Sequence, residues 1–155
     1  MTFNKIITWI LFYSCTLVAT SNALIWEIDS TWYKALLAPA FSPPSWLFGP
    51  VWTILYVLIA TSAYRFVFMK TTNIKPILLA LWALQMTLNT IWVSIYFGAK
   101  DLFSALIVII ILWLCIFILV TLSWRIDKIS SFLLMPYLLW ISFATILNVS
   151  YWYLN

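Results

Sequence analysis

The hydrophobic residues of this chain fall into five long runs, and the short stretches between them carry most of the charged residues. The runs cover residues 6–26, 46–68, 76–99, 102–124 and 129–153. Each run can cross the hydrocarbon core of a bilayer as a helix, which takes about 20 apolar residues. The short links leave no room for a separate soluble domain. We therefore predict an all-α fold, in which residues 1–155 form a single integral membrane bundle of five transmembrane helices.

The composition agrees with this class and excludes several kinds of chemistry. Of the 155 residues, 66% are hydrophobic and 8% are charged, whereas about a quarter are charged in soluble domains. The chain has no histidine, the commonest metal ligand, and its two glycines cannot form a glycine-rich phosphate loop. Cys15 and Cys115 lie in the middle of runs, without the spacing of a disulfide or metal site. We expect no metal site and no required cofactor.

The first run allows a second interpretation. Lys5, the apolar residues that follow it and the small residues of 21–23 are similar to a secretory signal with its cleavage site. The apolar run continues through Trp26, however, which is longer than the core of such a signal. We interpret it as the first transmembrane helix.

The distribution of basic residues predicts the orientation. Five spans place the two ends of the chain on opposite sides of the membrane. Lys34 and Lys100 lie on one side. The other side carries Lys5, Arg65, Lys70, Lys75, Arg125 and Lys128. The positive-inside rule then places the N-terminus in the cytoplasm and the C-terminus outside. The net charge of +4 serves this topology, and without a basic recognition module we expect no nucleic-acid partner.

The link between the first two runs, residues 27–45, contains Pro39, Pro43 and Pro44. Proline lacks an N–H donor and is excluded from helix interiors, so we expect stiff, non-helical backbone at these prolines. Such backbone beside a bilayer needs protein or water to satisfy its polar groups. We call residues 27–45 the covering loop and expect it to fold over the bundle and cover a ligand site. Pro136, by contrast, is expected to mark the entry into the last helix.

The third run carries Gln85, Asn89 and Trp92 at positions i, i+4 and i+7, and hence on one helical face. Two interpretations stay open for the two amides. They can join helices through hydrogen bonds, or they can line a cavity and orient a carbonyl or carboxylate of a ligand. The tryptophan on the same face favours the cavity.

The helical rise of about 1.5 Å per residue places several aromatic and polar residues in the outer half of the bundle. Trp52 would lie near the mouth of a pocket beneath the covering loop, Tyr56 one turn deeper, and Trp140 near the floor. Tryptophan also gathers at membrane interfaces without any ligand, and we assign that role, or simple packing, to most of the other tryptophans.

Three groups of motifs carry a family resemblance that spans nearly the whole chain. The loop and second run contain Trp32, Tyr33, Pro43, Pro44, Trp46, Gly49, Pro50, Trp52 and Tyr56. The third run contains Gln85, Leu88, Asn89 and Trp92. The fifth contains Pro136, Tyr137, Trp140, Phe143, Ala144, Leu147 and Asn148. This pattern resembles the TspO/MBR family, the tryptophan-rich sensory proteins whose mitochondrial members are called translocator protein or peripheral-type benzodiazepine receptor.

The resemblance implies a membrane receptor or sensor that binds tetrapyrroles, chiefly protoporphyrin IX, and also isoquinoline- and benzodiazepine-type ligands. It implies a homodimer in contact with membrane lipid, which we expect in a bacterial cell membrane. Carried over by motif, together with Gln85 from the helical-face argument, the ligand-binding residues are Tyr33, Pro43, Trp52, Tyr56, Gln85, Asn89, Trp92, Trp140, Ala144 and Leu147.

The resemblance also implies two alternative functions. One is light-dependent degradation of porphyrin, in which Trp52 and Trp140 are the catalytic candidates. The other is a small carrier of apolar ligands across the membrane. The chain departs from the family at Ala38, where many members have lysine. It also lacks, at residues 149–155, the basic residue of the cholesterol motif of animal members. We therefore do not expect cholesterol recognition.

Overall fold

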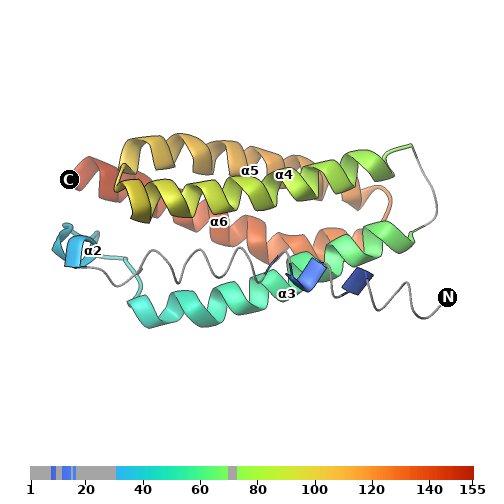
Figure 1. The fold of residues 1–155 in the computed structure, drawn as a ribbon, viewed down its shortest axis with the longest axis horizontal. Helices are drawn as coiled ribbons and strands as arrows, with labels where there is room; N and C mark the ends of the chain where they lie inside the picture. The colour runs from blue at the N-terminus through green and yellow to red at the C-terminus, as the bar shows by residue number, and fades with distance from the viewer. Residues whose placement is uncertain (1–7, 10–11, 15, 17–30, 70–72) are drawn as a thin grey trace.

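Four long helices form an antiparallel bundle in the computed structural model, which describes residues 8–9, 12–14, 16, 31–69 and 73–155. The long helices are α3 (Phe48–Phe68), α4 (Lys75–Val93), α5 (Leu102–Trp124) and α6 (Lys128–Leu154). A short helix, α2 (Thr31–Ala35), lies at the end of the bundle where α6 finishes (Figure 1). A 3-10 turn, η1 (Ser45–Leu47), leads into α3, and a π-helical segment, η2 (Ser94–Ala99), extends α4.

These helices confirm the all-α membrane bundle predicted from the sequence. Among the described residues, four helices with their short extensions are long and apolar enough to cross a membrane: Ser45–Phe68, Lys75–Ala99, Leu102–Trp124 and Lys128–Leu154. The predicted first span, residues 6–26, lies mostly outside the described residues. Those described within it are helical, and Phe12 packs its ring edge against Trp82 of α4.

Two features of the helices differ in detail from the sequence prediction. Residues 31–35 of the covering loop form one helical turn, which ends before the first proline. Pro136, expected at the entry to the last helix, lies inside α6. That expectation was wrong because α6 begins at Lys128, two turns earlier. Proline is tolerated inside transmembrane helices because neighbouring groups can satisfy the freed backbone.

The turn between η2 and α5 illustrates how local chemistry sets a helix boundary. Lys100 adopts a left-handed conformation with φ of 58°, which ends η2. The Asp101 carboxylate then accepts hydrogen bonds from the backbone N–H groups of Phe103 and Ser104, at 3.1 and 3.0 Å. These bonds satisfy donors that the first turn of a helix leaves without partners. Asp101 therefore fixes the start of α5.

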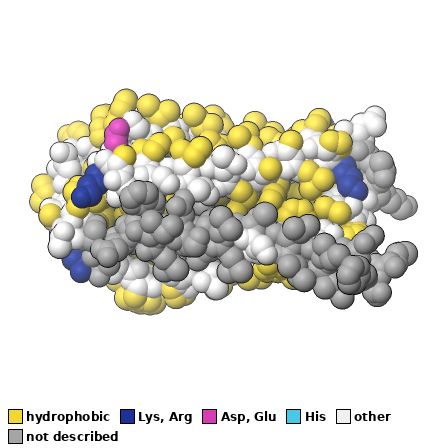
Figure 2. Space-filling view, in the orientation of Figure 1, with side chains coloured by type: hydrophobic (Ala, Val, Ile, Leu, Met, Phe, Trp, Pro, Cys, Tyr) yellow, Lys and Arg dark blue, Asp and Glu magenta, His cyan; other side chains and the backbone are white. Residues whose placement is uncertain are grey.

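The outer surface of the bundle is apolar along its length. Helix α5 makes its most extensive contacts with α6 and then with α4, and α3 packs mainly on α6. The outward-facing side chains of α5 are large and apolar: Phe103, Ile107, Ile110, Ile111, Leu114, Phe117 and Ile118. A helix that is hydrophobic on all sides is typical of a membrane span. Figure 2 shows apolar side chains along the middle of the visible face and basic side chains near its two ends.

Candidate ligand-binding site

A buried hydrogen-bonded network joins three helices in the centre of the bundle. The Tyr56 hydroxyl of α3 donates to Asn89 Oδ1 of α4 at 3.0 Å. The Asn89 Nδ2 donates in turn to the hydroxyl of Tyr137 on α6, at 3.4 Å. All three residues are buried. Both polar atoms of Asn89 therefore have partners, as expected for an amide that joins helices.

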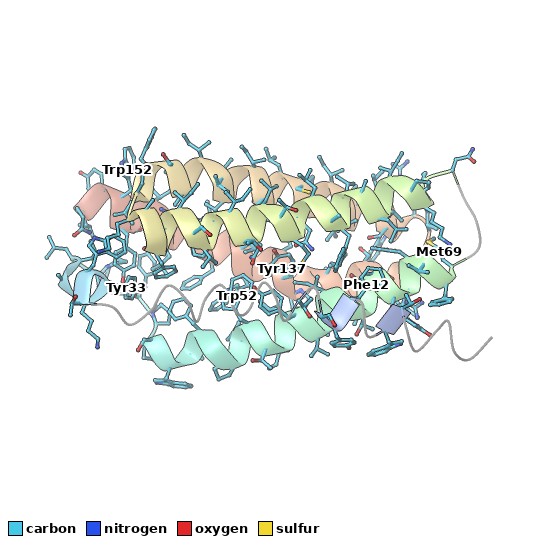
Figure 3. The ribbon with its side chains drawn as sticks, in the orientation of Figure 1. Phe12, Tyr33, Trp52, Met69, Tyr137 and Trp152 are labelled. Atoms are coloured by element: carbon cyan, nitrogen blue, oxygen red, sulfur yellow. The ribbon has the colours of Figure 1, made fainter. Side chains whose placement is uncertain are left out.

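Trp52 lies beside this network. Its ring stacks on Tyr56, with centroids 5.3 Å apart, and meets Tyr137 edge-on at 6.2 Å. Figure 3 shows Trp52 and Tyr137 close together in the middle of the bundle. The i, i+4 spacing of Trp52 and Tyr56 places both rings on the same face of α3. An aromatic wall thus adjoins the buried amide.

Gln85 differs sharply from Asn89, although the two lie on the same face of α4. Its side chain is fully buried, and neither Oε1 nor Nε2 has a hydrogen-bond partner among the described residues. An unsatisfied buried polar group costs about 1–3 kcal/mol. Buried polar side chains without a hydrogen-bond partner are rare in native proteins. Among the described residues, Gln85 thus carries a buried amide whose two polar atoms have no hydrogen-bond partner.

A small cavity lies beneath Tyr33. Its volume is about 30 Å³, which is comparable to the space of a single water molecule. The Trp92 indole N–H donates to Asn148 Oδ1 at 3.1 Å, and Asn148 Nδ2 donates to the Leu102 carbonyl at 2.9 Å. The side chains around the cavity are Tyr33, Phe48, Trp92, Tyr96, Phe97, Ala144, Leu147 and Asn148. The structure thus brings together Tyr33, Trp92, Ala144 and Leu147 of the predicted set.

The covering loop is tied to the end of α6 above this cavity. The hydroxyl of Tyr151 lies 3.0 Å from Ser42 Oγ and donates to the hydroxyl of Tyr33 at 3.2 Å. Pro43 follows Ser42 directly, at the start of the extended segment that leads to η1. Burial raises the pKa of the Tyr33 hydroxyl, and its contact with Tyr151 adds to the shift. Tyr33 therefore remains protonated at neutral pH.

Trp140 does not line the small cavity. It lines an open groove of about 420 Å³ between α3 and α6. The other side chains of this groove are Val51, Ile54, Leu55, Pro136, Leu139 and Phe143. The edge of Phe48 approaches the Trp140 ring, with centroids 5.9 Å apart. Phe48 lines the small cavity and thus contacts residues on both sides, the cavity and the Trp140 ring of the groove.

The predicted site residues are therefore distributed over a polar centre, a small cavity and an outer groove. Their assembly around one ligand stays a prediction. Sequence reasoning had not assigned site roles to Tyr137, Tyr151 or Ser42. A signal for Tyr151 was present, since Ala144, Asn148 and Tyr151 follow the i, i+4, i+7 spacing of one helical face.

Comparison with known proteins identifies the family. A model of the TspO/MBR family matches residues 10–154. The chain is 36% identical to Protein CrtK of Rhodobacter capsulatus over 145 residues, which cover 93% of this chain and 89% of that protein. It is 34% identical to the tryptophan-rich protein TspO of Chlorobaculum tepidum, over 91% of this chain and 90% of that protein. Identity to the human translocator protein is 32%, over 78% of this chain and 73% of that protein.

The family match covers all the helices named above, from α2 to the end of α6. The family resemblance predicted from the motifs in the loop, the third run and the fifth run is therefore confirmed. With its four described membrane-length helices and this match, the chain belongs to the TspO/MBR family of membrane receptors and sensors and is an integral membrane protein.

Proposed function

We propose that this protein binds tetrapyrroles, chiefly protoporphyrin IX, and isoquinoline- or benzodiazepine-type ligands within its helix bundle. The observation that carries this proposal is the fully buried Gln85 amide, which has no partner among the described residues and lies one turn from Asn89. Its Nε2 can donate to a ligand carbonyl or carboxylate. The neighbouring Trp52 and Tyr56 rings offer stacking surfaces, and such aromatic contacts contribute about 1 kcal/mol each beyond burial.

Binding of such ligands requires the bundle to open. Sites for small molecules typically enclose about 300–1,000 Å³, whereas the cavity under Tyr33 holds about 30 Å³. The covering loop is the element to move, because it is tied to α6 by a few hydrogen bonds at Ser42, Tyr33 and Leu37. The described conformation is then a closed state, and a ligand shifts the population toward an open one.

Replacing Gln85 by leucine tests the proposal. We expect Gln85→Leu to fold and to resist heat at least as well as the wild type, because it removes an unsatisfied buried amide. Its affinity for protoporphyrin IX should fall roughly tenfold, the equivalent of about 1.4 kcal/mol. The measurement is quenching of tryptophan fluorescence during titration in darkness.

Thr87→Val provides a matched control on the same helix, since Thr87 is exposed and bonds only the Ala83 carbonyl of its own helix. The control should bind like the wild type. Unchanged affinity in Gln85→Leu would contradict the assignment of Gln85 as the polar anchor. A gain in thermal stability alone would then identify it as a packing defect.

Light-dependent porphyrin degradation is a second candidate, favoured by the aromatic contacts of Trp52. The Trp52 indole stacks on Tyr56 and touches Tyr137 edge-on, which places three oxidisable rings together beside the proposed site. A carrier function, a homodimer and a location in a bacterial cell membrane remain predictions from family membership.

A further inference from the structure

A second groove opens at the opposite end of the bundle from the covering loop. It lies between the end of α3 and the link from α5 to α6, and its volume is about 300 Å³. Its lining is Tyr64, Arg65, Phe68, Met69, Ile126 and Asp127. Apolar rings and aliphatic chains thus surround one ion pair. Neither the ligand proposal nor the family motifs involve these residues.

The ion pair holds the Arg65 guanidinium in a defined orientation. Its Nε and Nη2 each donate to one oxygen of the Asp127 carboxylate at 2.8 Å. The Ser130 hydroxyl donates to Asp127 Oδ2 at 2.6 Å and fixes the carboxylate in turn. An arginine has five N–H donors in a planar fork. The Nη1 edge of Arg65 takes no part in these bonds and is available to another anion.

The surroundings of the groove carry an excess of positive charge. Arg125 and Lys128 flank the lining residues Ile126 and Asp127, and both are exposed. Lys75 donates from its ammonium group to the Val67 carbonyl at the end of α3. Four basic residues and one acidic residue therefore give this end a net charge of +3 among the described residues. Asp127 orients Arg65 without cancelling the local charge.

We propose that this groove binds one anionic phospholipid. The phosphate would lie against Arg65 Nη1, with Arg125 and Lys128 nearby, and the first part of an acyl chain would lie on Phe68 and Met69. Arginine recognises phosphate oxygens through charge-assisted hydrogen bonds, and basic pockets at helix ends bind anionic head groups. The position at the end of a membrane span places the head group at the water interface and the chain in hydrocarbon.

Thermal unfolding of the detergent-purified protein tests this proposal. Phosphatidylglycerol should raise the Tm by several degrees, and one lipid should stay bound in native mass spectrometry. Phosphatidylcholine with the same chains should do neither, because it carries no net charge. Inorganic phosphate at equal concentration should also fail, because it has no acyl chain to fill the apolar walls.

Two double variants of matched charge locate the site. Arg125→Gln with Lys128→Gln should lose most of the phosphatidylglycerol shift, whereas Lys34→Gln with Lys100→Gln, at the other end, should keep it. Arg65→Gln with Asp127→Asn removes the ion pair without leaving an unpaired charge and should abolish retention of the lipid. The proposal is overturned by equal shifts with both lipids, by the same shift with phosphate alone, or by equal loss in the two surface double variants.

Discussion

The side chain of Asn155 forms two hydrogen bonds with the backbone of Leu37, although the residues lie 118 positions apart in the chain. Its Oδ1 accepts from the Leu37 N–H at 2.9 Å, and its Nδ2 donates to the Leu37 carbonyl at 3.2 Å and to the Tyr151 carbonyl at 2.9 Å. One side chain at the end of α6 thereby holds the covering loop just before its prolines.

Removing this clamp should open the loop. We expect Asn155→Ala to bind protoporphyrin IX faster than the wild type, because the closed state loses two exposed hydrogen bonds, which contribute about 0.5 kcal/mol each at the lower end of the usual range. Stopped-flow quenching of tryptophan fluorescence measures the association rate. Ser150→Ala, which loses only a bond within α6, is the control. Equal association rates in all three proteins would show that the clamp does not limit access.

Light-dependent chemistry should depend more on Trp52 than on Trp140. Trp52 contacts Tyr56 and Tyr137 in the interior, whereas Trp140 lines the outer groove. We expect phenylalanine at either position to preserve binding of protoporphyrin IX in darkness, because most of the aromatic surface remains. Under illumination, Trp52→Phe should slow the loss of Soret absorbance more than Trp140→Phe. Equal bleaching in both variants, the wild type and empty micelles would leave only the receptor function.

The ion pair between Arg65 and Asp127 should make stability depend on pH. The Arg65 guanidinium holds the pKa of the Asp127 carboxyl below its usual value, with a smaller contribution from Ser130. A carboxyl whose pKa is lowered by folding stabilises the protein at pH values above its pKa in the unfolded chain, which is about 4. This contribution to stability is lost as the pH falls through the lower pKa that the carboxyl has in the folded protein.

The loss should appear as a fall in Tm on acidification from pH about 5 to about 3. Asp127→Asn should show a smaller fall in Tm over this range. Ser130→Ala keeps the ion pair and should show a fall almost as large as that of the wild type. The same slope in the wild type and Asp127→Asn would mean that another carboxyl controls the acid response.

The orientation in the membrane can be tested by labelling one residue at each end of the bundle. Lys34 lies in α2, at the same end as the last residues of α6, whereas Arg125 follows the last residue of α5 at the other end (Figure 1). Because most basic residues share the Arg125 end, we expect it to face the cytoplasm. In a background without Cys15 and Cys115, a cysteine replacing Ala38 should react with an impermeant maleimide on intact cells, and one replacing Arg125 should react only after lysis. The reverse pattern would invert the topology.

The fold class, four of the membrane spans and the family could be predicted from the amino-acid sequence. Four of the predicted runs became α3 to α6 within a few residues, because a run of about 20 apolar residues has no other stable form in a bilayer. The prolines of the loop likewise excluded helix by their own chemistry. These features depend on local composition, so no tertiary information was needed to find them.

The hydrogen-bond partners of the polar side chains, by contrast, depend on how the helices pack. Gln85 and Asn89 are both amides on one face of α4, and nothing in their spacing separates them. Asn89 hydrogen-bonds Tyr56 and Tyr137 at its depth in the bundle, whereas no described residue hydrogen-bonds the Gln85 amide. The clamp between Asn155 and Leu37 is equally invisible in the sequence. Such pairings depend on which helices come together and at what depth, and that is set by the packing of the whole bundle.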